Sequence, residues 1–380
     1  MSYDPNEPHK LPPIKKETLI HIQSNLMSEL TKANIAMAQL KGYLRGLPQT
    51  SAMLMSPIFI KEAVESSEVE NINTTLLEVM QRQISPNIEN KSSSQLVVNY
   101  LTASRWGYDH IGKYGLTHRI ITGIQHRLMP DATEGFRRLP VVIGDGRSKV
   151  HYTPPQASDI PELISDWEKL VNNNRQIDPL ILAAAAHYQF EAIHPFEDGN
   201  GRTGRMLINL HFINADILDI PVVHISQYIN THKSQYYKLL RTITAEGKLE
   251  EFVRFMLKAF TTQANHSFAL LQQIQELQDT YKQEMRSKLP SVYSRELLNA
   301  IFAKPVQTPV QLAKDMGTHY ITSSKYLKKL EEIGLLDCVK KGRYTYYVNF
   351  NLLALIEKKR HMEPKRAAIM KTEVKDKWHE

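Results

Sequence analysis

One glycine-rich segment, residues 194–205, constrains the fold of this 380-residue chain more than any other. It reads His-Pro-Phe-Glu-Asp-Gly-Asn-Gly-Arg-Thr-Gly-Arg. The alanine-rich run Ile181–Phe190 before it is a strong helix former, and Pro195 disfavours helical geometry at His194. A new helix opens within the glycines, which let a backbone approach a ligand closely. The sequence therefore predicts a tight loop between two helices, placed to bind a ligand.

The polar residues of this loop suit a phosphate-binding site. Backbone N–H groups and the positive end of the new helix attract anions. Arg202 and Arg205, three residues apart, are neighbours on that helix and can hold further phosphate oxygens. Asp198 offers oxygen ligands to Mg²⁺, which takes one or two carboxylates plus substrate phosphates. His194 can act as a general base near neutral pH.

Two other glycine patterns explain the loop less well. Gly199, Gly201 and Gly204 satisfy G-x-G-x-x-G, but that fingerprint needs a preceding strand, and a helix-forming run precedes it here. The phosphate loop G-x-x-x-x-G-K-[ST] fails because no lysine occupies its place. A purely structural turn between helices is the remaining alternative. The convergence of histidine, aspartate, asparagine and two arginines on one loop argues against it.

The segment resembles the Fic-domain motif H-P-F-x-[D/E]-G-N-G-R-x-x-R and matches it at every defined position. The resemblance implies a helical enzyme that uses ATP and Mg²⁺ to transfer AMP to a hydroxyl of a target protein. It implies that His194 removes the proton from that hydroxyl and that Asp198 holds Mg²⁺. The residues that would bind ATP are Glu70, His194, Gly199, Asn200, Gly201, Arg202, Thr203, Gly204, Arg205 and Tyr236.

The resemblance also assigns parts of the nucleotide to particular residues. Asn200 and the loop amides would bind phosphate oxygens, and Arg202 and Arg205 would contact the β- and γ-phosphates. Further along the chain, Tyr236 would lie at the base and sugar. We expect the adjacent Tyr237 in the core, the usual place for a tyrosine on an apolar helix.

Residues 136–152 predict a β-hairpin, because β-branched runs flank Gly144-Asp145-Gly146. In the family, a hairpin flap docks an extended segment of the target. Exposed strand backbone can align a partner by strand addition, independent of its side chains. The alternative is a structural hairpin that caps the helices.

An upstream segment matches the family's inhibitory motif, [S/T]-x-x-x-E-[G/N], with Ser66, Glu70 and Asn71 in the defined places. Ser66 and Glu70 share one helix face. The resemblance implies that Glu70 pairs with Arg205 and makes ATP bind unproductively. The alternative is a solvated acidic helix end. In some such proteins the same glutamate supports removal of AMP, so the reverse reaction stays open.

The positive charge of the chain, a net +7, is concentrated near its end. Residues 1–285 hold 28 Lys and Arg against 30 Asp and Glu, whereas residues 286–350 hold 11 against 5 and residues 351–380 hold 8 against 5. This distribution suggests either an acidic partner or nucleic acid for the C-terminal part, or a solvated basic face.

Residues 291–350 resemble a winged-helix module. Three helices are expected: one over 291–303, a second capped by Thr308 with Gly317 after its end, and a third over 320–333. A hairpin of 335–339 and 344–348 follows, around Lys340-Lys341-Gly342-Arg343. DNA contact through the third helix and the basic wing is plausible, but such modules also serve in dimerisation and protein docking, and we do not favour DNA. The third helix would present Thr318, Thr322, Ser323, Lys325 and Lys329.

We therefore expect a mainly α protein: a helical Fic core with a small hairpin flap, plus a C-terminal winged helix. The single cysteine, Cys338, excludes an intrachain disulfide. No membrane span or secretion signal is evident, so we expect a cytoplasmic protein without membrane contact. The expected parts are a helical region with the inhibitory motif at 1–95, the catalytic core at 96–265, a connecting helix at 266–290, the winged helix at 291–350 and a charged tail at 351–380.

Three functional alternatives accompany this expectation. The chain could be a DNA-binding regulator whose core only senses nucleotide, an enzyme that removes AMP, or one that moves another phosphate-containing group. Complete agreement with the motif favours AMP transfer to a protein docked on 136–152. Self-modification and a homodimer are both compatible with the sequence, which identifies neither the target nor the acceptor residue type.

Overall fold

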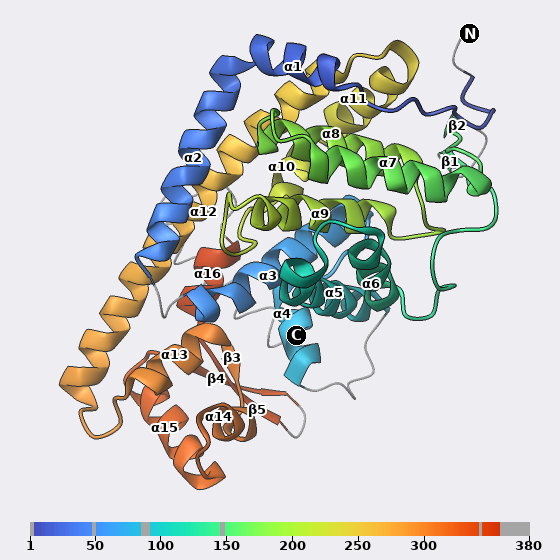
Figure 1. Ribbon diagram of the computed structural model, residues 1–380. Coiled ribbons are helices and arrows are strands. Elements are labelled where there is room, and N and C mark those ends of the chain that lie inside the picture. Colours follow the sequence, from blue (N-terminus) through green and yellow to red (C-terminus); the bar gives the residue numbers. More distant parts are fainter. Residues whose placement is uncertain (1–3, 48–50, 85–91, 145–148, 342–343, 358–380) are drawn as a thin grey trace. The chain divides into compact units, whose positions relative to one another are not determined.

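The computed structural model describes residues 4–47, 51–84, 92–144, 149–341 and 344–357 (Figure 1). They are mainly α-helical with two small antiparallel sheets, which confirms the expected fold class. The chain divides into two compact units. The first unit comprises Met1–Tyr43, Glu62–Asn73 and Gln95–Asn265, and the second comprises Leu44–Lys61, Thr74–Ser94 and His266–Glu380.

The centre of the first unit is α8 (Pro179–Ile193), whose residues from Leu180 to Ile193 are all buried except Glu191. A helix that is apolar all round requires neighbours on every side. Two of them are α7 (Ile160–Asn173) and α9 (Asn200–Asn214), and the three helices pack side by side in Figure 1. The start of α8 is fixed by Asp178, whose carboxylate accepts a hydrogen bond from the Leu180 N–H.

Other helices surround this centre. Two helical stretches are each interrupted, the first at Leu26 and the second at His232. The surrounding helices are α1 (Lys16–Asn25), α2 (Met27–Arg45), α3 (Ser51–Val69), α5 (Ser92–Tyr114), α6 (His118–Leu128), α10 (Ile225–Thr231), α11 (Lys233–Glu246) and the first part of α12 (Leu249–Lys288). A short 3-10 turn, η1 (Ala157–Asp159), leads into α7.

The predicted hairpin is present but small. It consists of β1 (Ile143–Gly144) and β2 (Val150–Tyr152), paired antiparallel with an irregular register. The β-branched residues Val141 and Val142 lie outside the strand, contrary to prediction, and residues 145–148 lie outside the described part of the chain. The Tyr152 hydroxyl donates a hydrogen bond to the Ala192 carbonyl at 2.7 Å, which ties β2 to the end of α8.

The second unit contains α4 (Leu76–Ile84) and a C-terminal group of helices and strands. A three-stranded antiparallel sheet has the order β3-β5-β4, and its short first strand was not predicted. The predicted cap at Thr308 is present, since its hydroxyl accepts a hydrogen bond from the Gln311 N–H. The C-terminal elements are α13 (Arg295–Ala303), β3 (Val306–Gln307), α14 (Pro309–Met316), α15 (Tyr320–Glu332), β4 (Asp337–Lys341), β5 (Tyr344–Val348) and α16 (Phe350–Glu357).

The surface of α15 differs from the predicted DNA-reading face. Ser323 is fully buried and its hydroxyl is 2.8 Å from that of Thr318, so two of the proposed recognition residues bind each other. Tyr320 and Ile321, at the start of the same helix, are exposed instead. Gly342 and Arg343 of the expected wing, and residues 358–380 of the expected tail, lie outside the described residues.

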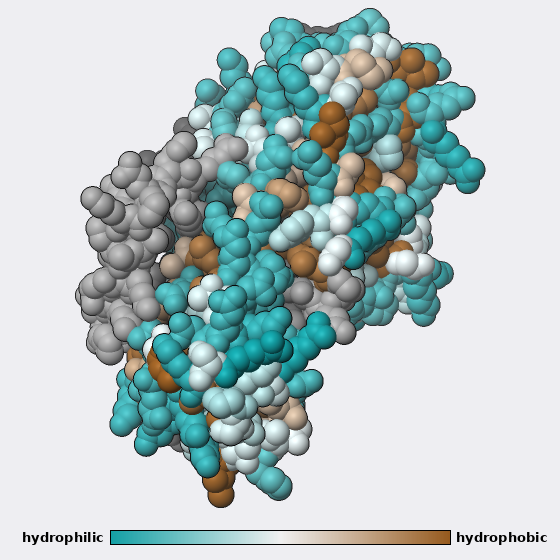
Figure 2. All heavy atoms as spheres, turned by 90° about the vertical axis from the view of Figure 1, so that its left-hand side faces the viewer, coloured by the Kyte–Doolittle hydropathy of each residue, from teal (hydrophilic) through white to brown (hydrophobic). Residues whose placement is uncertain are grey.

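No helix within the described ranges is both long and apolar enough to cross a membrane. On the face that Figure 2 presents, hydrophobic residues lie in small groups between hydrophilic ones.

Candidate active site

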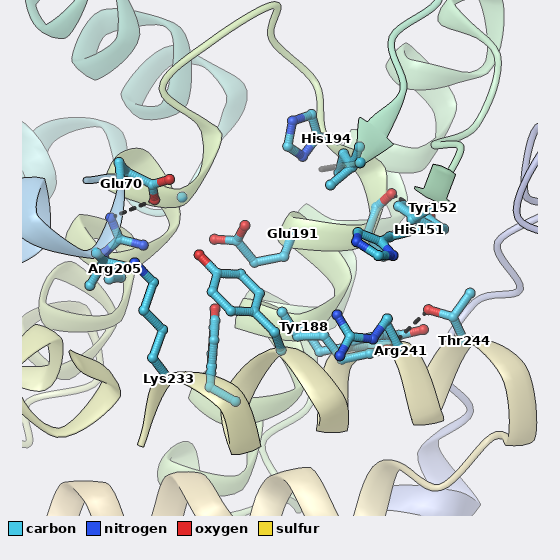
Figure 3. Close-up of a pocket in the computed structure, with 18 of the residues that line it drawn as sticks. Glu70, His151, Tyr152, Tyr188, Glu191, His194, Arg205, Lys233, Arg241 and Thr244 are labelled. Atoms are coloured by element: carbon cyan, nitrogen blue, oxygen red, sulfur yellow. Dashed lines mark hydrogen bonds and ion pairs between the residues drawn. The ribbon is translucent and has the colours of Figure 1, made fainter. Parts of the chain in front are cut away.

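His194 lies where α8 ends. Its backbone is left-handed, with φ 49° and ψ 60°, and its N–H donates to the Phe190 carbonyl at 3.1 Å. A residue other than glycine rarely adopts such a conformation, which costs free energy and is typical of functional sites. The turn follows from Pro195, which disfavours a continued helix at the residue before it. The imidazole therefore lines the cavity shown in Figure 3.

Burial lowers the pKa of the His194 imidazole to about 4, although hydrogen bonding to the Glu191 backbone opposes the shift. The positive charge of Arg137 lowers this pKa further, whereas Glu70 and Asp198 raise it. Around pH 7 the ring is therefore neutral and carries a free lone pair, which is the state a general base requires.

The loop after His194 is closed by its own side chains. Asn200 accepts a hydrogen bond from the Phe196 N–H at 2.9 Å and donates to the Phe196 carbonyl at 2.8 Å. Gly199 has φ 81°, and a Cβ atom there would lie 3.1 Å from Leu128. The Asn200 side chain, which the family resemblance assigns to phosphate binding, thus shapes the loop that starts α9.

Gln125 of α6 braces the same loop, and sequence reasoning missed it. Its amide donates to the Asp198 carbonyl at 2.8 Å, and its oxygen accepts from the Thr203 hydroxyl at 3.2 Å. The hydroxyl of Thr203, one of the predicted ATP-binding residues, is therefore directed at Gln125. The available signal was a glutamine on the apolar face of α6, where it is buried.

Arg202 is a buried cation with unused donors. Only 2% of its surface is exposed, and its Nε and Nη1 atoms have no hydrogen-bond partner in the described part of the chain. Its Nη2 atom contacts the Met129 sulfur at 3.4 Å and lies 3.6 Å from the Asp198 carboxylate. A buried donor without a partner costs about 1–3 kcal/mol, and more when it is charged. This guanidinium therefore suits an anion such as phosphate.

Arg205, one turn further along α9, is fully engaged. Its Nε donates to the Ser66 hydroxyl at 2.9 Å, and its Nη2 donates to the Ser66 carbonyl at 2.8 Å and to the Glu70 carboxylate at 2.9 Å. The predicted ion pair between Glu70 and Arg205 is therefore present. Burial would raise the pKa of Glu70, but the charge and hydrogen bond of Arg205 outweigh it and hold the pKa below its usual value.

The residues at the end of α3 lie so close to α9 that a side chain at position 201 would displace the ion pair. A Cβ atom there would lie 2.4 Å from the Glu70 carboxylate and 2.9 Å from Arg205. Asn71 follows with φ 60°, the left-handed conformation that glycine and asparagine adopt after a helix. Its side-chain oxygen accepts a hydrogen bond from the Lys233 ammonium at 2.9 Å, which fixes this end to α11.

A cavity of about 460 Å³ extends from this ion pair to the hairpin. Figure 3 shows Glu70 and Arg205 on one side, Tyr152 and Arg241 on the other, and Glu191 between them. Its walls come from the end of α3, the hairpin, α8, α9 and α11. The volume and the mixed polar and apolar lining suit a small-molecule ligand.

Both tyrosines of the predicted pair line this cavity. Tyr236 is buried, and its hydroxyl lies 2.8 Å from the His187 ring nitrogen. Tyr237 is half-buried and borders the cavity, so its assignment to the core was wrong. Burial raises the pKa of Tyr237 to about 12, so its hydroxyl stays protonated and can donate a hydrogen bond.

Glu191 and Lys233 also line the cavity, and neither was predicted. Burial raises the pKa of Glu191 to about 7, although Arg205 lowers it. Gly204 makes room for this carboxyl group, since a Cβ atom there would lie 2.4 Å from the Glu191 oxygen. Both residues stand outside the known motif, so only the packing of α8 and α11 brings them to the site.

Asp198 lies exposed at the rim of the loop and accepts a hydrogen bond from the Gly199 N–H. The described residues contain no cluster of three or more His, Cys, Asp or Glu side chains that could hold a metal ion. The donor set still fits Mg²⁺, which needs only one or two carboxylates when substrate phosphates supply the remaining ligands.

Comparison with known families matches two parts of the chain to the Fic/DOC family. The family's N-terminal model matches residues 27–109, and its Fic/DOC model matches residues 115–212, which include the 194–205 loop. A third match, over residues 277–352, is described as the C-terminal domain of a protein adenylyltransferase, SoFic-like.

Curated relatives and solved structures agree with these matches. The chain is 29% identical to protein adenylyltransferase Fic of Drosophila grimshawi over 219 residues, which are 56% of this chain and 38% of that protein. It is 33% identical to the Drosophila melanogaster protein of the same name over 167 residues, which are 42% of this chain and 30% of that protein. The chain thus spans less than half the length of these relatives.

Two solved structures share the fold at 20% identity. A Fic family protein from Desulfovibrio desulfuricans G20 has a TM-score of 0.53, with coverage of 87% of this chain and 97% of that chain. Fic-1 (aa134–508) from C. elegans has a TM-score of 0.51, with coverage of 66% and 75%. At this identity the comparison supports the fold alone.

Proposed function

We propose that this chain is a protein adenylyltransferase that moves AMP from ATP to a hydroxyl side chain of a target protein and is restrained by Glu70. One observation carries the proposal: a neutral, half-buried His194 precedes the loop that leads to Arg202, a buried cation with unused donors on α9. A base beside an anion site is what attack by a hydroxyl on a phosphate ester requires.

In this proposal the triphosphate lies at the start of α9, held by backbone N–H groups and Arg202, and the adenosine occupies the cavity near Tyr236. His194 takes the proton of the target hydroxyl while that oxygen attacks the α-phosphorus and pyrophosphate leaves. Asp198 would hold Mg²⁺, which supplies charge neutralisation to the phosphates. Positioning by the loop supplies most of the remaining rate.

The ion pair between Glu70 and Arg205 supports the proposed autoinhibition. Arg205 cannot offer its Nη2 atom to a γ-phosphate while Ser66 and Glu70 accept from it. The Glu70 carboxylate, ionised by this contact, would also repel the triphosphate. ATP could then settle only with its α-phosphorus displaced from the line of attack.

The hairpin supports target docking. Leu139 and Val142, which precede and flank β1, are 66% and 59% exposed, so this edge offers apolar side chains as well as strand backbone. We propose that the target, or a second copy of the chain in self-modification, adds an extended segment here. The proposed catalytic core is 96–265, with ATP and Mg²⁺ as its ligands.

For residues 291–350 we retain the winged-helix interpretation, with protein contact preferred to DNA. Ser323 is buried and bonded to Thr318, and Tyr320 and Ile321 take the exposed places where a DNA reader needs polar side chains. The single cysteine, Cys338, is compatible with a reducing compartment, and the cytoplasm is the proposed location.

The test is incubation of the full-length protein, wild type and Glu70→Gly, with ATP labelled on either the α- or the γ-phosphate. We expect protein-bound label from α-labelled ATP only, and more of it with Glu70→Gly. Label from γ-labelled ATP would indicate phosphate transfer instead. No label with either donor would favour a nucleotide-sensing regulator, and loss of label from premodified protein on incubation would reveal the reverse reaction.

A further inference from the structure

Arg137 lies at the base of the hairpin, outside every motif of the family, and is 96% buried, with only 4% of its surface exposed. Its three kinds of side-chain nitrogen each donate to a different backbone carbonyl. Nε donates to His194 at 2.9 Å, Nη1 to Leu139 at 3.1 Å and Nη2 to Pro155 at 2.6 Å. Its own N–H donates to the Pro195 carbonyl at 2.9 Å.

Burying a guanidinium costs free energy, because its charge is removed from water. Burial lowers the pKa of Arg137 below its usual value, and no carboxylate forms an ion pair with it among the described residues. An apolar side chain of similar volume would pack there without the desolvation penalty. What arginine alone provides is a rigid fork of five donors, able to hold several carbonyls at fixed positions.

The three carbonyls belong to two parts of the proposed machinery. Leu139 precedes β1 and Pro155 follows β2, so Arg137 joins the two ends of the hairpin. His194 is the proposed base, and its backbone is held in the left-handed conformation. One side chain therefore connects the segment that would deliver the hydroxyl with the residue that would deprotonate it.

We infer that Arg137 is a positioning residue that couples the target-docking hairpin to His194, so that base and incoming hydroxyl meet in a fixed geometry. This inference rests on the proposed AMP transfer. It predicts that loss of Arg137 impairs the chemical step more than ATP binding, because the side chain does not line the cavity. A displacement of about 1 Å can lower a rate about 100-fold.

Electrostatics provides a second, independent signature. The charged groups that act on the imidazole are Glu70 at the end of α3, Asp198 in the loop and Arg137 beside the hairpin, and the backbone of Glu191 in α8 also contacts it. Glu70 and Asp198 raise the pKa of His194, and Arg137 lowers it. Removing the positive charge should therefore move the acid limb of the pH–rate profile to higher pH.

The experiment compares Arg137→Gln, Arg137→Lys and Arg119→Gln in the full-length Glu70→Gly protein. Arg119 is an exposed arginine on α6, so its variant is the matched control. The rate of AMP incorporation is measured against ATP concentration and against pH. In parallel, hydrogen exchange is followed in peptides covering 139–144, 149–155 and 190–196.

We expect Arg137→Gln to lower the maximal rate about 10- to 100-fold, to change half-saturation by ATP less than about threefold, and to shift the acid limb upward. Arg137→Lys keeps the charge and should restore the acid limb but not the full rate. Exchange should rise in the three segments with Arg137→Gln, and Arg119→Gln should match the parent in every measurement.

Two results would overturn the inference: unchanged rate, pH profile and exchange, or a loss of rate matched by equal loss of ATP binding and exchange raised throughout the first unit. The second result would mean a merely structural arginine. If the Glu70→Gly parent transfers no AMP, the proposed function is wrong. The hydrogen exchange measured in the three segments then decides by itself whether Arg137 couples the hairpin to His194.

Discussion

Two arginines on α9, one turn apart, experience opposite surroundings. Arg202 is buried with two nitrogens that have no partner in the described chain, whereas Arg205 donates three hydrogen bonds to α3. The same residue type on the same helix is thus open to an anion at one position and occupied by a carboxylate at the other. In the proposed function, the site can therefore hold part of the triphosphate, while Glu70 blocks the place of the rest.

The contrast extends to the residues beside each arginine. Near Arg202, the loop is rigid before any ligand binds, because Asn200 and Gln125 hold its backbone. Near Arg205, the partners are the Ser66 hydroxyl and carbonyl and the Glu70 carboxylate, which a competing phosphate would have to replace. In the proposed function, the loop supplies the catalytic geometry and the end of α3 supplies the regulation.

The largest effect is expected for a substitution of His194. His194→Ala should lower AMP incorporation about 10²- to 10⁴-fold while ATP binding changes little, because the imidazole acts on the incoming hydroxyl and Arg202 holds the phosphates. Incorporation from α-labelled ATP and ATP binding by calorimetry would measure the two effects in the Glu70→Gly background. Wild-type turnover in His194→Ala would show that another group is the base.

A substitution of Glu70 is expected to change AMP incorporation in the opposite direction. Glu70→Gly should raise AMP incorporation about 10- to 100-fold, the equivalent of one hydrogen bond to a charged group, because it frees Arg205 for the γ-phosphate. Glycine at a helix end costs about 1 kcal/mol at most, so the fold should survive. Glu68→Gly is the matched control, since Glu68 is exposed two residues away. Equal incorporation by all three proteins would leave Glu70 as a structural carboxylate.

The residues of the site differ in how well they could be predicted from the sequence. The loop at 194–205 could be predicted because its chemistry is contiguous, and Ser66 and Glu70 could be found because they match a short motif of the family that this chain resembles. Gln125, Arg137, Glu191 and Lys233 could not, since tertiary packing alone brings them together. Gln125 and Arg137 are buried and Glu191 and Lys233 are half-buried, and no local sequence pattern singles them out.

Local patterns also misjudged where regular structure stops. The β-branched residues Val141 and Val142 promised longer strands than the hairpin has. Pairing depends on the partner strand and not on propensity alone.

A second comparison lies along α3. Glu62 lies within α3 and Glu70 directly follows its end. Glu70 pairs with Arg205, whereas Glu62 is buried, with Ser226 donating to one oxygen and no partner for the other among the described residues. Burial raises the pKa of Glu62 to about 8. One carboxylate is thus ionised by its neighbour and the other is kept protonated by its surroundings.

This difference predicts a pH effect on stability. Below pH 4.5 Glu62 is protonated in both states; between pH 4.5 and about 8 only the folded state keeps the proton, so stability falls as pH rises. Between pH 5.5 and pH 8 we expect the free energy of unfolding of Glu62→Gln to fall by about 1–3 kcal/mol less than that of the wild type. This difference corresponds to several degrees in the unfolding midpoint. Thermal unfolding of wild type, Glu62→Gln and Glu68→Gln would measure it, and parallel pH curves would show that Glu62 ionises normally.

The smallest effect is expected at Asn71, which separates the two contributions that hold the end of α3. Asn71→Gly keeps the left-handed turn at φ 60° but loses the hydrogen bond to Lys233, whereas Asn71→Ala loses the bond and also strains the turn. A single hydrogen bond contributes about 0.5–1.5 kcal/mol, and a side chain other than asparagine in this conformation adds about 1 kcal/mol. AMP incorporation should therefore rise about two- to fivefold with Asn71→Gly and further with Asn71→Ala, while both stay below Glu70→Gly.

Initial rates at equal ATP would order the three variants. If Asn71→Gly equalled Glu70→Gly, the bond to Lys233 would be the main restraint, and the ion pair with Arg205 would be secondary.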